Sequence, residues 1–196
     1  DRAGHSESDG DLIDISVPDE IDQLSAMLDM VGEGAHLIGH SLGGMEVATL
    51  AGRLPDRIAS LTLLAPAAAS VDDVARGQAL GRPIAPLAQG APLDIDGQAL
   101  GRAFVEGMAG YDPFAGLERF ARPVFLHHGL ADTVVDPAYS RRYAEIFPDA
   151  RLTTYPHADH GWASLESRGQ LIANCVRELS TLRRRDGAQE RRAAAD

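Results

Sequence analysis

Two patterns of apolar residues alternate along the chain. Short runs of consecutive apolar residues are typical of buried strands, and stretches with apolar residues every three or four positions are typical of helices. The predicted strands cover 35–39, 58–64, 124–128 and 151–155. The predicted helices cover 16–32, 45–54, 137–147 and 162–182. This alternation predicts an α/β fold, in which helices flank a mostly parallel sheet.

Residues 67–121 interrupt this pattern. They are rich in Gly, Pro and Ala and have little periodicity. Long irregular segments inside compact domains commonly serve as functional lids. We therefore expect 67–121 to form a cap over an active site, inserted between two parts of a core at 1–66 and 122–182. The Ala-, Arg- and Glu-rich residues 183–196 are expected to form a disordered tail.

The composition is that of one globular domain: 196 residues, 44% hydrophobic and 24% charged. A net charge of −11 argues against a nucleic-acid partner or an anionic membrane surface. No apolar run reaches the roughly 18 residues that a membrane helix needs. All 18 basic residues are Arg, so Schiff-base and P-loop lysine chemistry is excluded. A cytoplasmic location is the default expectation.

The sequence predicts neither a disulfide nor a metal site. Cys175 is the single cysteine, and its apolar helical surroundings predict a small core residue. His157 and His160 are spaced like metal ligands, but no set of acidic or cysteine partners accompanies them. No metal and no cofactor are therefore expected.

The segment at 39–43, Gly-His-Ser-Leu-Gly, fits the pattern G-x-S-x-G between a predicted strand and a predicted helix. This turn is so tight that side chains two positions before and after the serine should clash, which predicts a need for Gly39 and Gly43. It also places the Ser41 hydroxyl at a helix N-terminus, where backbone N–H groups stabilise an oxyanion. The motif predicts a nucleophile; a helix-capping serine in a Gly-rich turn is the alternative.

A serine nucleophile needs an adjacent base, and the base needs an acid that fixes its tautomer. After a nucleophile elbow the acid and then the histidine follow, each on a loop beyond a later strand. Asp132 follows the strand at 124–128, and His160 follows the strand at 151–155. We therefore predict Ser41 as nucleophile, His160 as base and Asp132 as the acid that orients the base.

Two other residues compete for these roles. Asp136 precedes Pro137, which makes it a natural helix N-cap. His157 is expected to be a turn residue or to contact the catalytic residues without touching the substrate. Three further histidines lie in or beside strands and are expected to be core residues with satisfied hydrogen bonds: His36, His127 and His128.

These motifs, in this order and at these separations, resemble the α/β-hydrolase superfamily over residues 1–182. The segments 39–44, 63–68, 128–135 and 158–160 look like those of bacterial cinnamoyl and feruloyl esterases, which carry a cap between the corresponding strands. The resemblance implies an α/β-hydrolase fold with a cap insertion. It also implies that the Leu42 backbone N–H is one oxyanion donor. His40, at the variable position of the elbow, is expected to pack against the pocket or to line it, and Trp162 is a candidate for contact with substrate.

The resemblance also places the beginning of the chain within the fold. Residues 1–8 look like the superfamily's loop after its fourth strand, usually D-x-x-G-x-G-x-S, with Ser6 where the second glycine is common. This register implies an N-terminally incomplete fold with four parallel strands and a bare edge at 35–39. The second oxyanion donor would precede Asp1. We expect such a chain to self-associate and to hydrolyse esters weakly.

The leading hypothesis is a carboxylic-ester hydrolase that forms an acyl-enzyme on a small-molecule ester, of the feruloyl or cinnamoyl type. A carbon–carbon bond hydrolase, thioesterase, acyltransferase or perhydrolase would share the triad, and these alternatives stay open. Dehalogenases and epoxide hydrolases are disfavoured because they use Asp in place of Ser41. A non-catalytic ligand-binding member of the fold is the alternative from a different class.

Overall fold

The computed structural model describes residues 3–95 and 97–193, with the side chains of the last helix described as far as residue 184. Its main sheet has four parallel strands with β1 at an edge, as predicted, and the strand order is β1-β2-β7-β8. These strands are β1 (Ala35–His40), β2 (Ile58–Leu64), β7 (Val124–Gly129) and β8 (Ala150–Tyr155).

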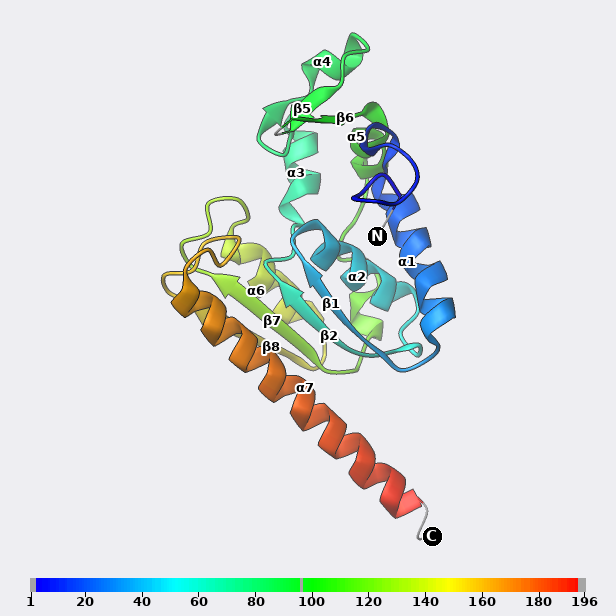
Figure 1. The fold of residues 1–196 in the computed structure, drawn as a ribbon, viewed down its shortest axis with the longest axis vertical. Helices are drawn as coiled ribbons and strands as arrows, with labels where there is room; N and C mark the ends of the chain where they lie inside the picture. The colour runs from blue at the N-terminus through cyan, green and yellow to red at the C-terminus, as the bar shows by residue number, and fades with distance from the viewer. Residues whose placement is uncertain (1–2, 96, 194–196) are drawn as a thin grey trace.

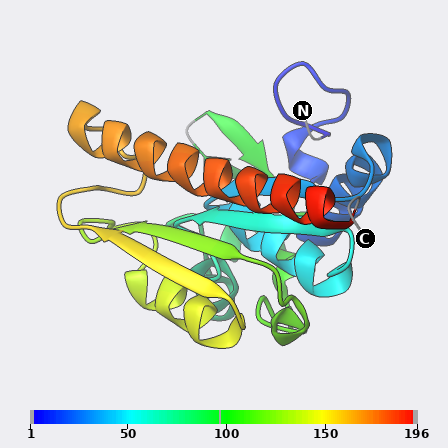
Figure 2. The same cartoon turned by 90° about the horizontal axis from the view of Figure 1, so that it is seen from below.

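Helices cover both faces of this sheet (Figures 1 and 2). The long helix α7 (Leu165–Ala193) crosses one face. On the opposite face lie α2 (Leu42–Arg53) and α6 (Pro137–Ile146), and α1 (Val17–Val31) packs against α2. Leu61, Leu63 and Leu126, fully buried strand residues, belong to the main core. The architecture is therefore a layered α/β fold with a parallel sheet at its centre.

Local capping chemistry sets the ends of α1 and α6. The Ser16 side chain accepts a hydrogen bond from Asp19 N at 3.3 Å and caps α1. Asp136 accepts one from Ala138 N at 2.8 Å and caps α6, as its position before Pro137 predicted. Gly32 ends α1 with a φ of 93°, a conformation that favours glycine.

Short elements between β2 and β7 form a layer beyond the carboxyl ends of the strands (Figure 1). They are α3 (Ala69–Ala75), β3 (Gln78–Ala79), β4 (Arg82–Pro83), α4 (Ala85–Ala88), β5 (Leu93–Ile95), β6 (Gln98–Leu100) and α5 (Arg102–Met108). The strands form two hairpins, β3–β4 and β5–β6. Beyond α5, the short 3-10 helix η2 (Leu117–Arg119) packs back against α2, so the return segment belongs with the core layer.

Contacts on more than one side join the layer to the rest of the molecule, including those of α5 with α1. The Tyr139 hydroxyl of α6 donates a hydrogen bond to Asp72 of α3. On the other side, α5 and β6 contact the 3-10 helix η1 (Leu12–Asp14) near the start of the chain. Gly101 is required at that contact, because a Cβ there would lie 1.9 Å from Ile13 O.

Strand β1 differs from its prediction as a buried strand. It pairs with β2 at one end of the sheet order, and its side chains alternate between exposed and partly buried. Leu37 packs against the main core, whereas Ile38 is 53% exposed. An apolar run therefore predicted the strand, but its place at the sheet edge left one face open.

The last helix differs from its prediction as well. It was expected to end near 182, before a disordered tail, but α7 continues to Ala193. Ala, Arg, Gln and Glu are strong helix formers, and no proline interrupts them. None of the described helices combines the length and the hydropathy that a membrane span requires.

Candidate active site

Ser41 occupies a strained turn between β1 and α2. Its φ of 55° and ψ of −122° are rare for a residue with a side chain. Two bonds fix the turn to the end of β2: Ser41 N donates to Leu64 O at 2.9 Å, and Ala67 N donates to Ser41 O at 2.9 Å. The sheet thus holds the hydroxyl in a conformation that local preferences alone disfavour.

Only one of the two predicted glycine requirements at this turn is observed. A Cβ on Gly39 would lie 2.4 Å from Gly43 O and 2.7 Å from Val47 Cγ2. A Cβ on Gly43 would meet nothing within 4 Å. The clash predicted on both sides of Ser41 therefore exists at Gly39 only, because it is the backbone of Gly43 that approaches the side-chain position of Gly39.

The structure brings Ser41, Asp132 and His160 together. His160 Nε2 lies 2.9 Å from Ser41 Oγ, and His160 Nδ1 lies 2.8 Å from Asp132 Oδ2. With the proton on Nδ1, His160 donates to Asp132 and accepts from the Ser41 hydroxyl. This is the arrangement in which a histidine can take a proton from serine while a carboxylate stabilises the resulting cation.

Asp132 is buried and held on both carboxylate oxygens. Its Oδ1 accepts hydrogen bonds from Val134 N at 2.8 Å and Val135 N at 2.9 Å. Burial alone would raise the pKa of this carboxyl, but the bonds from Val135 N, His160 and Val134 N together hold the pKa below its ordinary value. Asp132 is therefore an anion at neutral pH, as a residue that stabilises an imidazolium must be.

The loops that carry Asp132 and His160 pack directly on each other. Ala131 N donates to Ala158 O at 3.0 Å. At Gly129, the last residue of β7, a Cβ would lie only 2.1 Å from the same carbonyl oxygen. A glycine is therefore required at 129 for the two loops to meet, a requirement that the sequence analysis did not identify.

The two rival residues lie elsewhere. The Asp136 side chain caps α6, and His157 is exposed. His128, which was expected to be a satisfied core histidine, is fully buried and bonded to Ser140 Oγ at 2.7 Å and Val135 O at 2.9 Å. His128 Nε2 also lies 3.2 Å from Asp132 Oδ2, the same carboxylate oxygen that His160 contacts. His128 and Asp132 are only four positions apart, but the contact depends on the turn after β7, whose conformation was not predicted from the sequence.

The two residues expected to contact substrate lie beside His160. His40 Nε2 donates to His160 O at 2.9 Å, and the two rings are 4.8 Å apart. Partial burial lowers the pKa of His40. Trp162 is only 3% exposed and packs edge-on against His40 and Tyr155. This burial favours a supporting role for Trp162 over the substrate contact expected from sequence.

Leu42 is the first residue of α2 and directly follows Ser41. The first N–H groups of a helix have no partner inside it, and the helix dipole favours negative charge at this end. The Leu42 N–H can therefore donate to an oxygen on a carbon attacked by Ser41.

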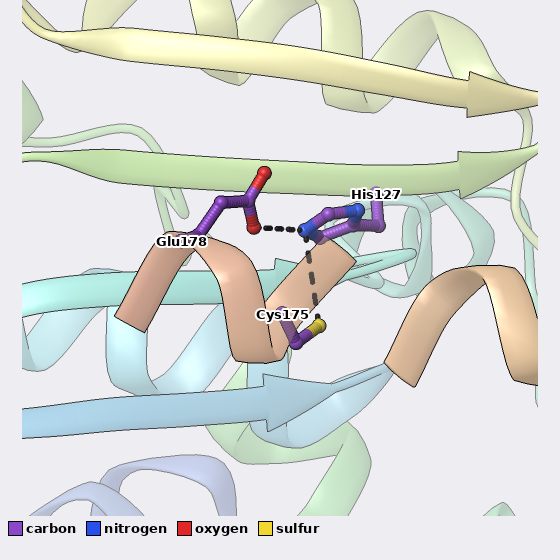
Figure 3. A group of neighbouring side chains, drawn as sticks. All are labelled: His127, Cys175 and Glu178. Atoms are coloured by element: carbon purple, nitrogen blue, oxygen red, sulfur yellow. Dashed lines mark hydrogen bonds and ion pairs between the residues drawn. The ribbon is translucent and has the colours of Figure 1, made fainter. Parts of the chain in front are cut away.

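Among the described residues, one group of three side chains holds its potential ligand atoms close enough together to bind a metal ion. The sequence analysis did not identify this group. It consists of His127, Cys175 and Glu178 and is separate from the Ser41 constellation (Figure 3).

The fold and this constellation define a class of protein. A family model described as alpha/beta hydrolase fold matches residues 1–84. The parallel sheet, its flanking helices and the elbow at Ser41 agree with that match. The chain has the α/β-hydrolase fold and is a hydrolase.

Solved structures provide particular likenesses. Est1E from Butyrivibrio proteoclasticus, with ferulic acid bound, is 25% identical with a TM-score of 0.81; the match covers 91% of this chain and 73% of Est1E. A monoacylglycerol lipase from Paleococcus ferrophilus is 22% identical with a TM-score of 0.72, covering 93% of this chain and 82% of the lipase. Mouse alpha/beta hydrolase domain-containing protein 10 is 22% identical with a TM-score of 0.71, covering 93% and 76%. No curated protein matches the sequence.

Proposed function

We propose that this protein hydrolyses carboxylic esters through an acyl-enzyme on Ser41, with His160 as base and Asp132 as the orienting acid. The observation that carries the proposal is the position of His160, with one ring nitrogen 2.9 Å from Ser41 Oγ and the other 2.8 Å from Asp132 Oδ2. A capping serine would not need a histidine and a buried carboxylate aligned with it.

In the acylation step, Ser41 Oγ attacks the ester carbonyl carbon while His160 Nε2 takes the hydroxyl proton. Asp132 stabilises the imidazolium, and the Leu42 N–H donates to the oxyanion. The carbon–oxygen bond to the alcohol then breaks, and His160 returns the proton to the leaving alkoxide. The products of this step are the free alcohol and an acyl-Ser41 ester.

In the deacylation step, water replaces the alcohol. His160 Nε2 takes a proton from the water, whose oxygen attacks the acyl carbon, and the bond to Ser41 Oγ breaks as His160 protonates the serine. The acid leaves and the enzyme is restored. No cofactor takes part in this reaction.

We further propose a feruloyl- or cinnamoyl-type ester as the substrate and, within residues 67–121, the layer from α3 to α5 as the cap that selects the acyl group. The likeness to Est1E with ferulic acid bound supports the substrate class. The hairpins and helices beyond the carboxyl ends of the strands support the cap, since they stand at the end of the sheet that carries Ser41 (Figure 1). Substitutions in this layer should change the ratio of rates between acyl groups more than the rate on a small ester.

Turnover of p-nitrophenyl acetate and methyl ferulate tests the proposal. Ser41→Ala and His160→Ala should each lose almost all activity, by similar factors, because the members of a triad act as a unit. A fluorophosphonate probe should label Ser41, seen as a mass shift on its tryptic peptide. Labelling should be absent from Ser41→Ala.

His157→Ala is the matched control, since this exposed histidine lies three residues before His160. It should retain wild-type turnover. Equal losses in His157→Ala and His160→Ala, or unimpaired turnover in Ser41→Ala, would contradict the mechanism. Hydrolysis of p-nitrophenyl acetate without any hydrolysis of methyl ferulate would keep the triad and reject the substrate class.

A further inference from the structure

A second group of reactive side chains lies between the sheet and α7 (Figure 3). His127 of β7 points toward α7, from which Cys175 and Glu178 point back. His127 Nε2 lies 3.0 Å from Glu178 Oε2 and 3.9 Å from Cys175 Sγ. The three ligand atoms all lie within 4.8 Å of one another.

We propose that His127, Cys175 and Glu178 form a binding site for a divalent transition metal, with zinc as the ion that the ligand set fits. Zinc is bound by imidazole, thiolate and carboxylate at about 2.0–2.3 Å in tetrahedral geometry. Those bond lengths place neighbouring ligand atoms roughly 3.3–3.8 Å apart. Two of the three separations, 3.0 and 3.9 Å, come within a few tenths of an ångström of that requirement, and the third, between Cys175 and Glu178, is at most 4.8 Å.

Burial and charge suit such a site. His127 is fully buried, whereas Cys175 and Glu178 are partly exposed, so an ion can enter from the α7 side. A thiolate and a carboxylate together balance the two charges of the ion; two nearby arginines, Arg151 and Arg177, oppose it. Mixed nitrogen, sulfur and oxygen ligands favour zinc over magnesium or calcium, which prefer oxygen alone.

The protons in the group can be accounted for when a metal binds. His127 Nε2 faces both other ligands, and its lone pair is available to a metal when the ring proton is on Nδ1. Nδ1 lies 2.8 Å from the Tyr155 hydroxyl, which also accepts a bond from Asn174 Nδ2 at 2.8 Å. With metal on Nε2, Nδ1–H donates to Tyr155, the orienting contact that metal-bound histidines usually make. The Cys175 thiol proton leaves to solvent.

The site is separate from ester hydrolysis and does not depend on that proposal. It uses none of the three residues assigned to the triad. A bound ion would crosslink α7 to β7, the strand that leads into the loop carrying Asp132. We therefore expect metal to stabilise the fold, and a coordination position is left for water.

The single cysteine makes the test direct. Full-length protein, reduced and stripped with a chelator, is titrated with Co²⁺ and then Zn²⁺. Cobalt should produce a thiolate-to-metal absorption band, which zinc should bleach. Zinc should also slow alkylation of Cys175 by a maleimide, and Mg²⁺ should not. At free zinc about 100 times Kd, the melting temperature should rise by roughly 5–10 °C.

Glu178→Gln should weaken zinc binding by about 100-fold or more, since loss of an outer-shell partner alone costs about 10–100-fold. Glu166→Gln is the matched control: it removes the same charge from an exposed position on the same helix and should bind like wild type. Equal alkylation with and without zinc would overturn the site. The site would also be overturned if zinc still protected Cys175 from alkylation in Glu178→Gln, because Glu178 would then not be needed as a ligand. Circular dichroism checks that each variant is folded.

Discussion

The glycines around Ser41 allow a graded test of how the nucleophile is positioned. The perturbation is a single methyl group added at Gly39, Gly44 or Gly43. At Gly39 the new Cβ would lie 2.4 Å from a backbone oxygen; at Gly44 it would lie 3.1 Å from Gly39 O and the Pro66 ring; at Gly43 it would meet nothing within 4 Å. None of the three has a positive φ, so crowding alone distinguishes them.

The magnitudes follow from these distances. At Gly39 the contact is with backbone, so β1 and α2 must separate by nearly 1 Å, and overpacking of this kind costs about 1–3 kcal/mol. A displacement of 1 Å at the reacting group costs about 10²-fold in turnover. Gly44→Ala needs only a few tenths of an ångström and should cost less. Gly43→Ala replaces a helical glycine by a better helix former and should stabilise the fold by about 0.5–1 kcal/mol.

Urea unfolding and ester turnover measure the two consequences separately. Trp162 is the single tryptophan and lies against His40, so its fluorescence reports on the region around the site during unfolding. The loss of stability and of turnover should be largest in Gly39→Ala and smaller in Gly44→Ala, and Gly43→Ala should show no loss of stability. If Gly39→Ala fails to fold, the order of the other two still decides. Damage from Gly43→Ala equal to that from Gly44→Ala would refute the reasoning.

Three further predictions concern single side chains. Asp132→Asn should lower turnover by roughly 10⁴, measured on p-nitrophenyl acetate. The pKa of the Asp132 carboxyl is lower in the folded than in the unfolded protein, so the ionised carboxylate stabilises the fold at neutral pH, and this stabilisation is lost as the pH falls below about 4. The free energy of unfolding of Asp132→Asn should lack this part of the pH dependence. Ser6 has a φ of 51°, so Ser6→Gly should raise the free energy of unfolding by about 1 kcal/mol; an unchanged urea midpoint would show that the strain is absent. Ser16→Ala removes the α1 cap and should cost about 1 kcal/mol in the same assay.

Est1E provides a practical comparison for the substrate assays. It matches over 91% of this chain, and its structure contains ferulic acid. Methyl ferulate and a short aliphatic ester, measured on both proteins in parallel, separate the chemical step from acyl selection. A cap layer that selects the acyl group should be exchangeable between them, and the preference should follow the exchanged segment.

The sequence by itself determined the main strands and helices of the core and their order along the chain. Four apolar runs predicted the four strands, and Ser16, Gly32 and Asp136 predicted helix ends, because these signals act within a few residues along the chain. The loops after the last two predicted strands also pointed to Asp132 and His160, since the carboxyl ends of parallel strands meet at one edge of a sheet.

Tertiary structure decided whatever depends on contacts between distant segments. The crowding at Gly39 but not Gly43 depends on how α2 leaves β1, and the need for Gly129 depends on a carbonyl from the following loop. The exposed face of β1 follows from its place in the strand order. His127, Cys175 and Glu178 meet only because α7 crosses β7, and residues 48 positions apart leave no spacing pattern from which that meeting could be predicted.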